Sequence, residues 1–259
     1  MLGKLIKYDL KWINKYMMIY FSVGFIFAIL CKITSHFTNV FVGLVLDKIC
    51  SGIEIACLVS ILVNCLMRCW VRFRNNLYKD ESYLTHTLPV SKATIYNSKI
   101  LASFISIIIA VIIIIICFSI VGLNEVLIKQ IKNVFADKEV AVLFIIFCLI
   151  VLLEITYLVL CGIIGNILGH QSNNHKMAKT ILITIILYGL LQCLLIGVIF
   201  IIGAFNNDVR QLYMDNVETL ENLNGVKTAV YVTFGIYLIY NIGLYIFGKK
   251  MLEKGVNVD

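Results

Sequence analysis

The chain has 259 residues and a formal net charge of +7; 61% of its residues are hydrophobic and a single one is proline. This composition excludes a soluble domain and is typical of a helical membrane protein, because a helix satisfies its backbone hydrogen bonds within one segment in lipid. Nucleic-acid binding is not expected either. It needs clustered basic residues, and the loops are too short to build a basic domain.

Six apolar runs predict an all-α integral membrane protein with six transmembrane helices. Residues 100–124, 180–207 and 228–248 contain no charged side chain, and residues 140–169 contain only Glu154. Each of these runs reaches the roughly 20 residues that span hydrocarbon. Residues 16–31 are uncharged but short, and residues 49–67 contain Glu54. We count both as crossings, in a single transmembrane domain over residues 1–259.

The number of basic residues alternates between high and low in successive segments outside these runs. Four segments hold 15 of the 22 Lys and Arg residues: those before the first run, between the second and third, between the fourth and fifth, and after the sixth. Cytoplasmic segments of membrane proteins are enriched in Lys and Arg. The alternation therefore predicts that both termini are cytoplasmic, in a bacterial cytoplasmic membrane.

Residues 1–15 predict an amphipathic elbow helix, with four lysines on one side and apolar residues such as Trp12 on the other. Such a helix lies among the lipid headgroups, where lysines meet anionic lipid. Asp9 falls within the apolar arc, and we interpret it as a solvated residue at the boundary. The alternatives are that it pairs with a lysine or backbone donor of a cytoplasmic loop, or that another protein docks there.

Residues 68–99 form the longest cytoplasmic connection and contain the proline, Pro89. Proline keeps the preceding residue out of the helical conformation, so we expect a short cytoplasmic helix to end there, with Ser91 as the N-cap of the next helix. A rigid element of this kind carries force from a soluble partner into the bilayer. On a helical wheel, a narrow apolar stripe is formed by Phe73, Leu77, Leu84 and Leu88.

This connection resembles that of permease subunits of bacterial type-2 ABC exporters, in which acidic-x-Tyr-Leu-x-x-x-Leu-Pro-Val-Ser follows the second span. The matching residues are Glu81, Tyr83, Leu84, Leu88, Pro89, Val90 and Ser91. The likeness extends to the elbow and the six-span layout. It implies a coupling helix that inserts into a separate ATPase subunit, with Leu77 and the matching residues as far as Val90 at the contact. It also implies a dimer, with a second copy or a related permease, bound to two ATPase subunits.

No motif predicts catalysis, a bound cofactor or a metal site. The nearest match to a nucleotide-binding loop, residues 243–250, has Lys250 where Ser or Thr must hold Mg²⁺, and it ends an apolar helix. We therefore expect ATP and Mg²⁺ in the partner subunit. Most of the nine cysteines lie within apolar runs, where Cys behaves as a small hydrophobic residue. Cys65 and Cys69 lie one helical turn apart, but no CxxC motif or paired His completes a zinc set.

Polar residues inside the apolar runs are candidates for a translocation pathway: Glu54, Asn64, Glu154, Gln192 and Asn241. A carboxylate at the centre of a span is disfavoured by roughly 2.5–3.5 kcal/mol even on insertion scales. The two glutamates must therefore be paired, protonated or hydrated. In the alternative interpretation these residues hydrogen-bond neighbouring spans and fix their packing.

Two further segments have both a structural and a functional interpretation. Gly165 and Gly169 form a GxxxG motif, which lets helices approach closely, and we expect packing within the subunit rather than across a dimer. Residues 206–227 predict an external amphipathic segment with acidic character. It is either an interfacial helix or an attractor for cationic substrates such as antimicrobial peptides.

We expect the permease subunit of an ATP-driven exporter of a peptide, an antibiotic or a lipid-like molecule, in contact with membrane lipids. The alternative is a membrane-embedded immunity or scaffold protein that binds a partner and transports nothing.

Overall fold

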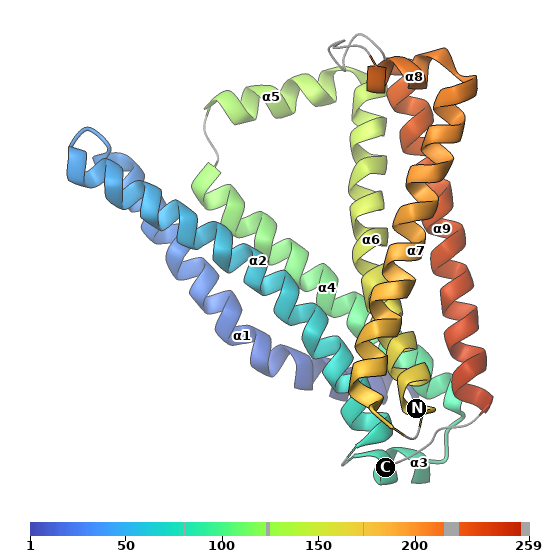
Figure 1. Cartoon of the computed structure of the whole chain (residues 1–259). Helices are drawn as coiled ribbons and strands as arrows, with labels where there is room; N and C mark the ends of the chain where they lie inside the picture. The colour runs from blue at the N-terminus through green and yellow to red at the C-terminus, as the bar shows by residue number, and fades with distance from the viewer. Residues whose placement is uncertain (80, 123–124, 173, 215–222, 255–259) are drawn as a thin grey trace. The chain divides into compact units, whose positions relative to one another are not determined.

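The computed structural model describes residues 1–79, 81–122, 125–172, 174–214 and 223–254, and every regular element in these ranges is a helix. Six of the described helices are long and apolar enough to cross a membrane. They coincide with the six predicted runs, which confirms the all-α class and a multi-pass membrane protein (Figure 1). Their bounds are α1 (Leu2–Thr34), α2 (Phe41–Tyr78), α4 (Lys92–Gly122), α6 (Lys138–His170), α7 (Lys176–Phe205) and α9 (Leu223–Lys254).

The chain divides into two compact units, with the boundary between residues 131 and 132. In unit 1, α1 packs against α2 and α4, and α2 packs against α4. The buried positions of α1 recur every three or four residues, so one stripe of this helix faces the core. Those positions are Asp9, Ile13, Met17, Phe21, Gly24, Ala28 and Cys31.

Unit 2 is organised around α6, which packs against both α7 and α9. Every residue of α6 from Val159 to Ile167 is buried, because neighbouring helices cover this part of α6 on more than one side. The short helix α8 (Asn207–Met214) packs against α7 and α9.

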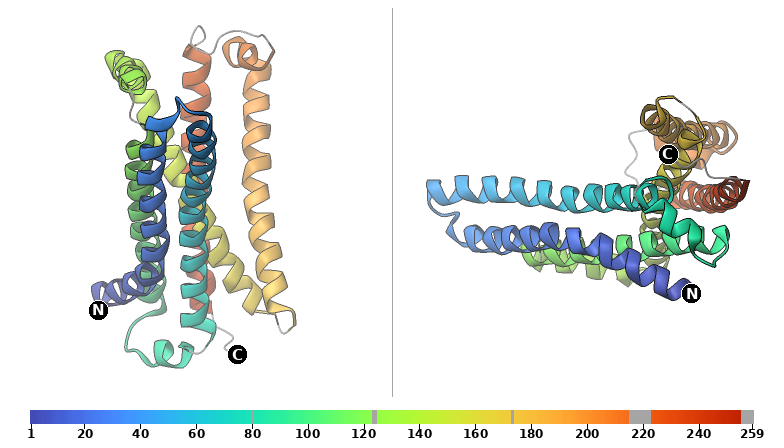
Figure 2. Two further views of the ribbon diagram at one scale, coloured as in Figure 1. Left: turned by 90° about the vertical axis from the view of Figure 1, so that its left-hand side faces the viewer. Right: turned by 90° about the horizontal axis from the view of Figure 1, so that it is seen from below.

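Residues 1–15, for which we predict an elbow, form the first part of α1, without a non-helical residue between them and the first span. Their four lysines, at positions 4, 7, 11 and 15, are exposed, whereas Ile13 is buried. Figure 2 shows the first turns of α1, beside the N label, at an angle to the rest of the helix.

The connections between the long helices differ from the prediction in two places. Helix α5 (Glu125–Ala136) was not predicted, although Ile128, Ile131 and Phe135 recur at helical spacing. The segment predicted over residues 206–227 forms the shorter helix α8 and, from Leu223, the start of α9. Residues 215–222 of that segment lie outside the described residues. The short helix η1 (Ser35–Phe37) follows α1.

The GxxxG motif of α6 packs against the start of α7, as predicted for contact within the subunit. A Cβ atom added at Gly165 would lie 2.1 Å from Oγ1 of Thr184 and 2.8 Å from the carbonyl oxygen of Thr180. A Cβ atom added at Gly169 would lie 2.1 Å from Oγ1 of Thr180 and 2.9 Å from its Cα. Both glycines are therefore required for this close helix contact.

We predict that Gly169→Ala lowers the free energy of unfolding by about 1–3 kcal/mol, the usual cost of overpacking a well-packed contact. Thermal unfolding of the purified protein in detergent measures this. Gly189→Ala is the matched control, because no atom lies within 4 Å of a Cβ added at that position of α7. If the two variants unfold at the same temperature, the glycine contact is not required.

Candidate functional site: a connector helix on a buried charge cluster

The connection between α2 and α4 contains the short helix α3 (Ser82–Thr87). Helix α2 ends at Tyr78, and the backbone of Lys79 is extended. The chain then turns, with the Ser82 N–H donating to the Lys79 carbonyl at 2.7 Å. A hydrogen bond from the Glu81 N–H to the Asn75 carbonyl, at 3.3 Å, ties the start of α3 back to α2.

The end of α3 and the start of α4 confirm two predictions. Leu88 is extended, with a ψ angle of 137°, immediately before Pro89. The Ser91 Oγ accepts a hydrogen bond from the Thr94 N–H at 3.2 Å, as expected of an N-cap.

The predicted apolar stripe along this segment needs a correction. Phe73 and Leu77 are each 1% exposed and face the core of unit 1, whereas Leu84 and Leu88 are exposed. The stripe is broken because α2 ends at Tyr78 and α3 begins at Ser82, so one helical wheel does not describe both helices.

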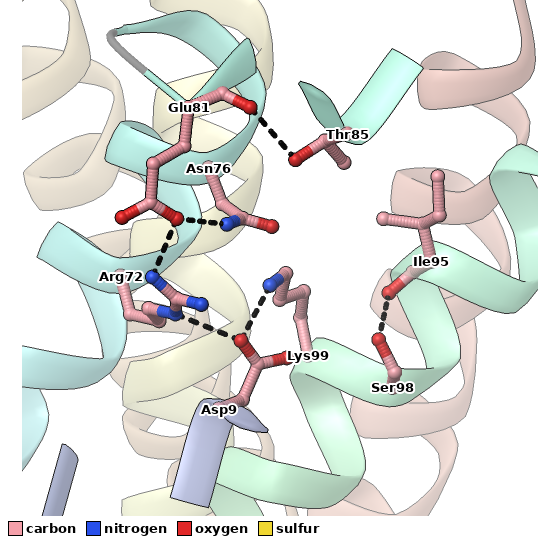
Figure 3. Close-up of polar contacts among 8 residues, drawn as sticks. All are labelled: Asp9, Arg72, Asn76, Glu81, Thr85, Ile95, Ser98 and Lys99. Atoms are coloured by element: carbon pink, nitrogen blue, oxygen red, sulfur yellow. Dashed lines mark hydrogen bonds and ion pairs between the residues drawn. The ribbon is translucent and has the colours of Figure 1, made fainter. Parts of the chain in front are cut away.

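A cluster of four charged side chains lies where α1, α2, α3 and α4 meet (Figure 3). Asp9 Oδ1 accepts hydrogen bonds from Arg72 Nε at 2.8 Å and from Lys99 Nζ at 2.7 Å. Arg72 Nη1 donates to Glu81 Oε2 at 2.7 Å, and Asn76 Nδ2 donates to the same oxygen at 2.5 Å. We call Asp9, Arg72, Glu81 and Lys99 the charge cluster.

The charge cluster is electrically balanced, with two acidic and two basic groups. Asp9, Lys99 and Arg72 are 2%, 5% and 9% exposed. Buried charges of this kind persist only when they are paired and hydrogen-bonded. The guanidinium group of Arg72 also lies 5.4 Å from the ring centroid of Trp12, within the range of a cation–π interaction.

The interpretation of Asp9 as a solvated boundary residue is wrong. Its alternative, pairing with a lysine of the connecting segment, is what the structure contains. Asp9 lies near the start of α1, Arg72 near the end of α2, and Lys99 near the start of α4. The N-terminal part of α1 and the connector therefore lie at the same end of unit 1.

The residues predicted to contact an ATPase fall into two groups. Tyr83, Leu84, Leu88 and Pro89 are exposed, and the side chains of Tyr83 and Leu84 are the most open, at 77% and 67%. Val90 is half-buried, Leu77 is buried, and Glu81 is bonded within the chain. We call Tyr83, Leu84 and Leu88 the connector face, and the other predicted residues lie beside or beneath it.

The structure brings together three of the five polar residues predicted inside the spans. Gln192 Nε2 donates to Glu154 Oε1 at 3.2 Å, and Asn241 Nδ2 donates to the carbonyl of Leu153, next in the chain to Glu154, at 3.3 Å. These three residues belong to unit 2.

The other two polar residues belong to unit 1. Asn64 Nδ2 bonds the Ser60 carbonyl of its own helix at 2.9 Å. Glu54 is 3% exposed, and neither carboxyl oxygen has a hydrogen-bond partner among the described residues.

No protein-family model, curated protein or solved structure matches this chain. A proposal for its function therefore depends on the residues described above.

We predict that Asp9→Asn lowers the free energy of unfolding by about 3–5 kcal/mol, because Arg72 and Lys99 are then buried with only one carboxylate. The double variant Asp9→Asn, Lys99→Met should recover part of this loss, since it restores charge balance with Glu81. Denaturation of the purified variants measures both effects. Lys79→Met, which removes an exposed charge next to α3, is the control. A double variant no more stable than Asp9→Asn would contradict the pairing.

Proposed function

We propose that this chain is the permease subunit of an ATP-driven exporter in a bacterial cytoplasmic membrane, with both termini cytoplasmic. Helix α3 is its coupling helix, and a separate ATPase subunit supplies ATP hydrolysis with Mg²⁺. The observation that supports this most strongly is the connector face, a short exposed apolar surface held on the charge cluster. An exposed apolar patch on a connection outside the spans is typical of a protein-binding site.

The connector face is suited to a groove in a soluble partner. Burial of each large apolar side chain contributes about 1.5–3 kcal/mol, so Leu84 and Leu88 together supply enough to dock a short helix. Tyr83 adds an aromatic ring with a polar tip, a side chain enriched at protein interfaces.

The charge cluster is suited to transmit a force from α3 to the spans. Glu81 precedes α3 directly and is bonded to Arg72 of α2, and Arg72 is bonded in turn to Asp9 of α1. Lys99 extends the same network to α4. A displacement of α3 therefore acts on three long helices at once, and closure of the ATPase subunits would bias the spans between two arrangements.

The working assembly is proposed to be a dimer of permeases, identical or related, bound to two ATPase subunits in membrane lipid. The alternative function is a membrane immunity or scaffold protein that uses the same connector face to bind a partner without transport. An ATPase as the bound partner distinguishes the first function from the second.

We predict that the double substitution Leu84→Asp, Leu88→Asp reduces co-purification of an ATPase with nucleotide-binding motifs at least about tenfold, because it places two charges in an apolar contact. Affinity purification from the native membrane measures recovery of the ATPase. Leu84→Met, Leu88→Met is the matched control, since it keeps apolar volume and should retain the partner. Membrane insertion should be unchanged in both variants. Equal recovery of the ATPase with the Asp variant would overturn the coupling role of α3.

A further inference from the structure

Unit 2 contains a cluster of tyrosines around the polar centre of α6. The ring of Tyr157 lies 6.1 Å from that of Tyr188, 6.3 Å from Tyr237 and 5.9 Å from Tyr240, measured between centroids. Tyr188 and Tyr237 also lie near the carboxyl group of Glu154. Side chains from α6, α7 and α9 thus form one aromatic cluster beside this carboxylate.

Two oxygen atoms in this cluster are buried without a hydrogen-bond donor. Glu154 accepts from Gln192 through Oε1, but its Oε2 has no partner among the described residues. The Asn241 side chain, which is 9% exposed, uses its Nδ2 on the carbonyls of Tyr237 and Leu153. Its Oδ1 has no partner within the described part of the chain. A buried acceptor without a donor is costly, so both atoms favour a ligand that donates hydrogen bonds.

The chemistry of these groups selects the class of ligand. A primary ammonium group carries three N–H donors and a positive charge, which match a carboxylate and an amide oxygen. Tyrosine rings attract such a cation through their faces. A metal ion is a poorer fit, because no group of three His, Cys, Asp or Glu residues within the described ranges is arranged to hold one.

We propose that Glu154, Asn241 and the four tyrosines bind the primary ammonium group of an amphiphilic molecule within the membrane. Glu154 and Tyr240 are half-buried and Tyr188 is 36% exposed, so the cluster is accessible along one side. The aliphatic part of the ligand then lies against the apolar surface of α7 and α9. The role of this ligand class as the substrate of the exporter rests on the proposed function. Binding itself does not, because it requires no ATPase.

The test measures saturable binding of radiolabelled dodecylamine to the full chain in phosphatidylcholine nanodiscs, with empty nanodiscs subtracted. Dodecylamine should bind, dodecanol should not compete because it has no charge, and dodecyltrimethylammonium should compete weakly because it has no N–H donor. Addition of phosphatidylethanolamine to the discs distinguishes two sources of the primary ammonium group, a lipid headgroup and a membrane-soluble amine. Reduced binding identifies a lipid headgroup as the natural ligand, and unchanged binding identifies a membrane-soluble amine.

Glu154→Gln should weaken dodecylamine binding at least about tenfold, because it keeps the shape of the side chain but removes its charge. Glu139→Gln, which removes an exposed carboxyl group at the start of the same helix, is the matched control and should bind like the unmodified chain. Tyr240→Leu is a second variant at the half-buried edge, with an expected loss of about threefold or more. Dodecylamine binding that persists at full strength in both Glu154→Gln and Tyr240→Leu, or equal competition by dodecanol, would overturn the site. Neither result bears on ATPase recovery, so failure of this inference and failure of the proposed function are distinguishable.

Discussion

The carboxylate of Asp9 is the group on which the arrangement of unit 1 depends. One of its oxygen atoms accepts from Arg72 of α2 and Lys99 of α4, so a single atom joins three long helices. Because charges removed from water must be compensated by their neighbours, none of these side chains can leave the cluster alone. The network thereby holds α3 in a fixed position on the long helices. A partner that binds the exposed Leu84 and Leu88 would therefore act on these helices as well, which it could not do through an isolated loop.

The two units differ in how their carboxylates are paired. In unit 1, Asp9 and Glu81 are matched by two cations of the same chain, and the cluster can be explained as structural. In unit 2, Glu154 has an amide and several tyrosines around it and no cation among its described contacts. A matched carboxylate holds helices together, whereas a carboxylate left with free acceptor capacity is available to a ligand. Glu54 of unit 1 also has free acceptor capacity among the described residues, but the tyrosine cluster lies in unit 2, and the binding proposal therefore concerns unit 2.

Features set by local sequence were predictable, and features set by distant contacts were not. The apolar runs, the stop before Pro89 and the Ser91 cap each depend on a few neighbouring residues, and the structure contains them. The partners of Asp9 are 63 and 90 residues away in the chain, and a helical wheel cannot show them. Leu77 illustrates the same limit, because its burial depends on how α2 packs within unit 1. The tyrosines around Glu154 come from three helices and were missed for that reason.

The account as a whole requires that the connector and its charge cluster face the cytoplasm. The most direct measurement is labelling of Lys79→Cys by a membrane-impermeant maleimide in the native host, with the unmodified chain as the blank for its own cysteines. Lys79 is exposed next to α3, so the new thiol is reachable from whichever side the connector occupies. We predict labelling only after the cells are permeabilised. Labelling of Lys79→Cys in intact cells would place the connector outside and contradict the account.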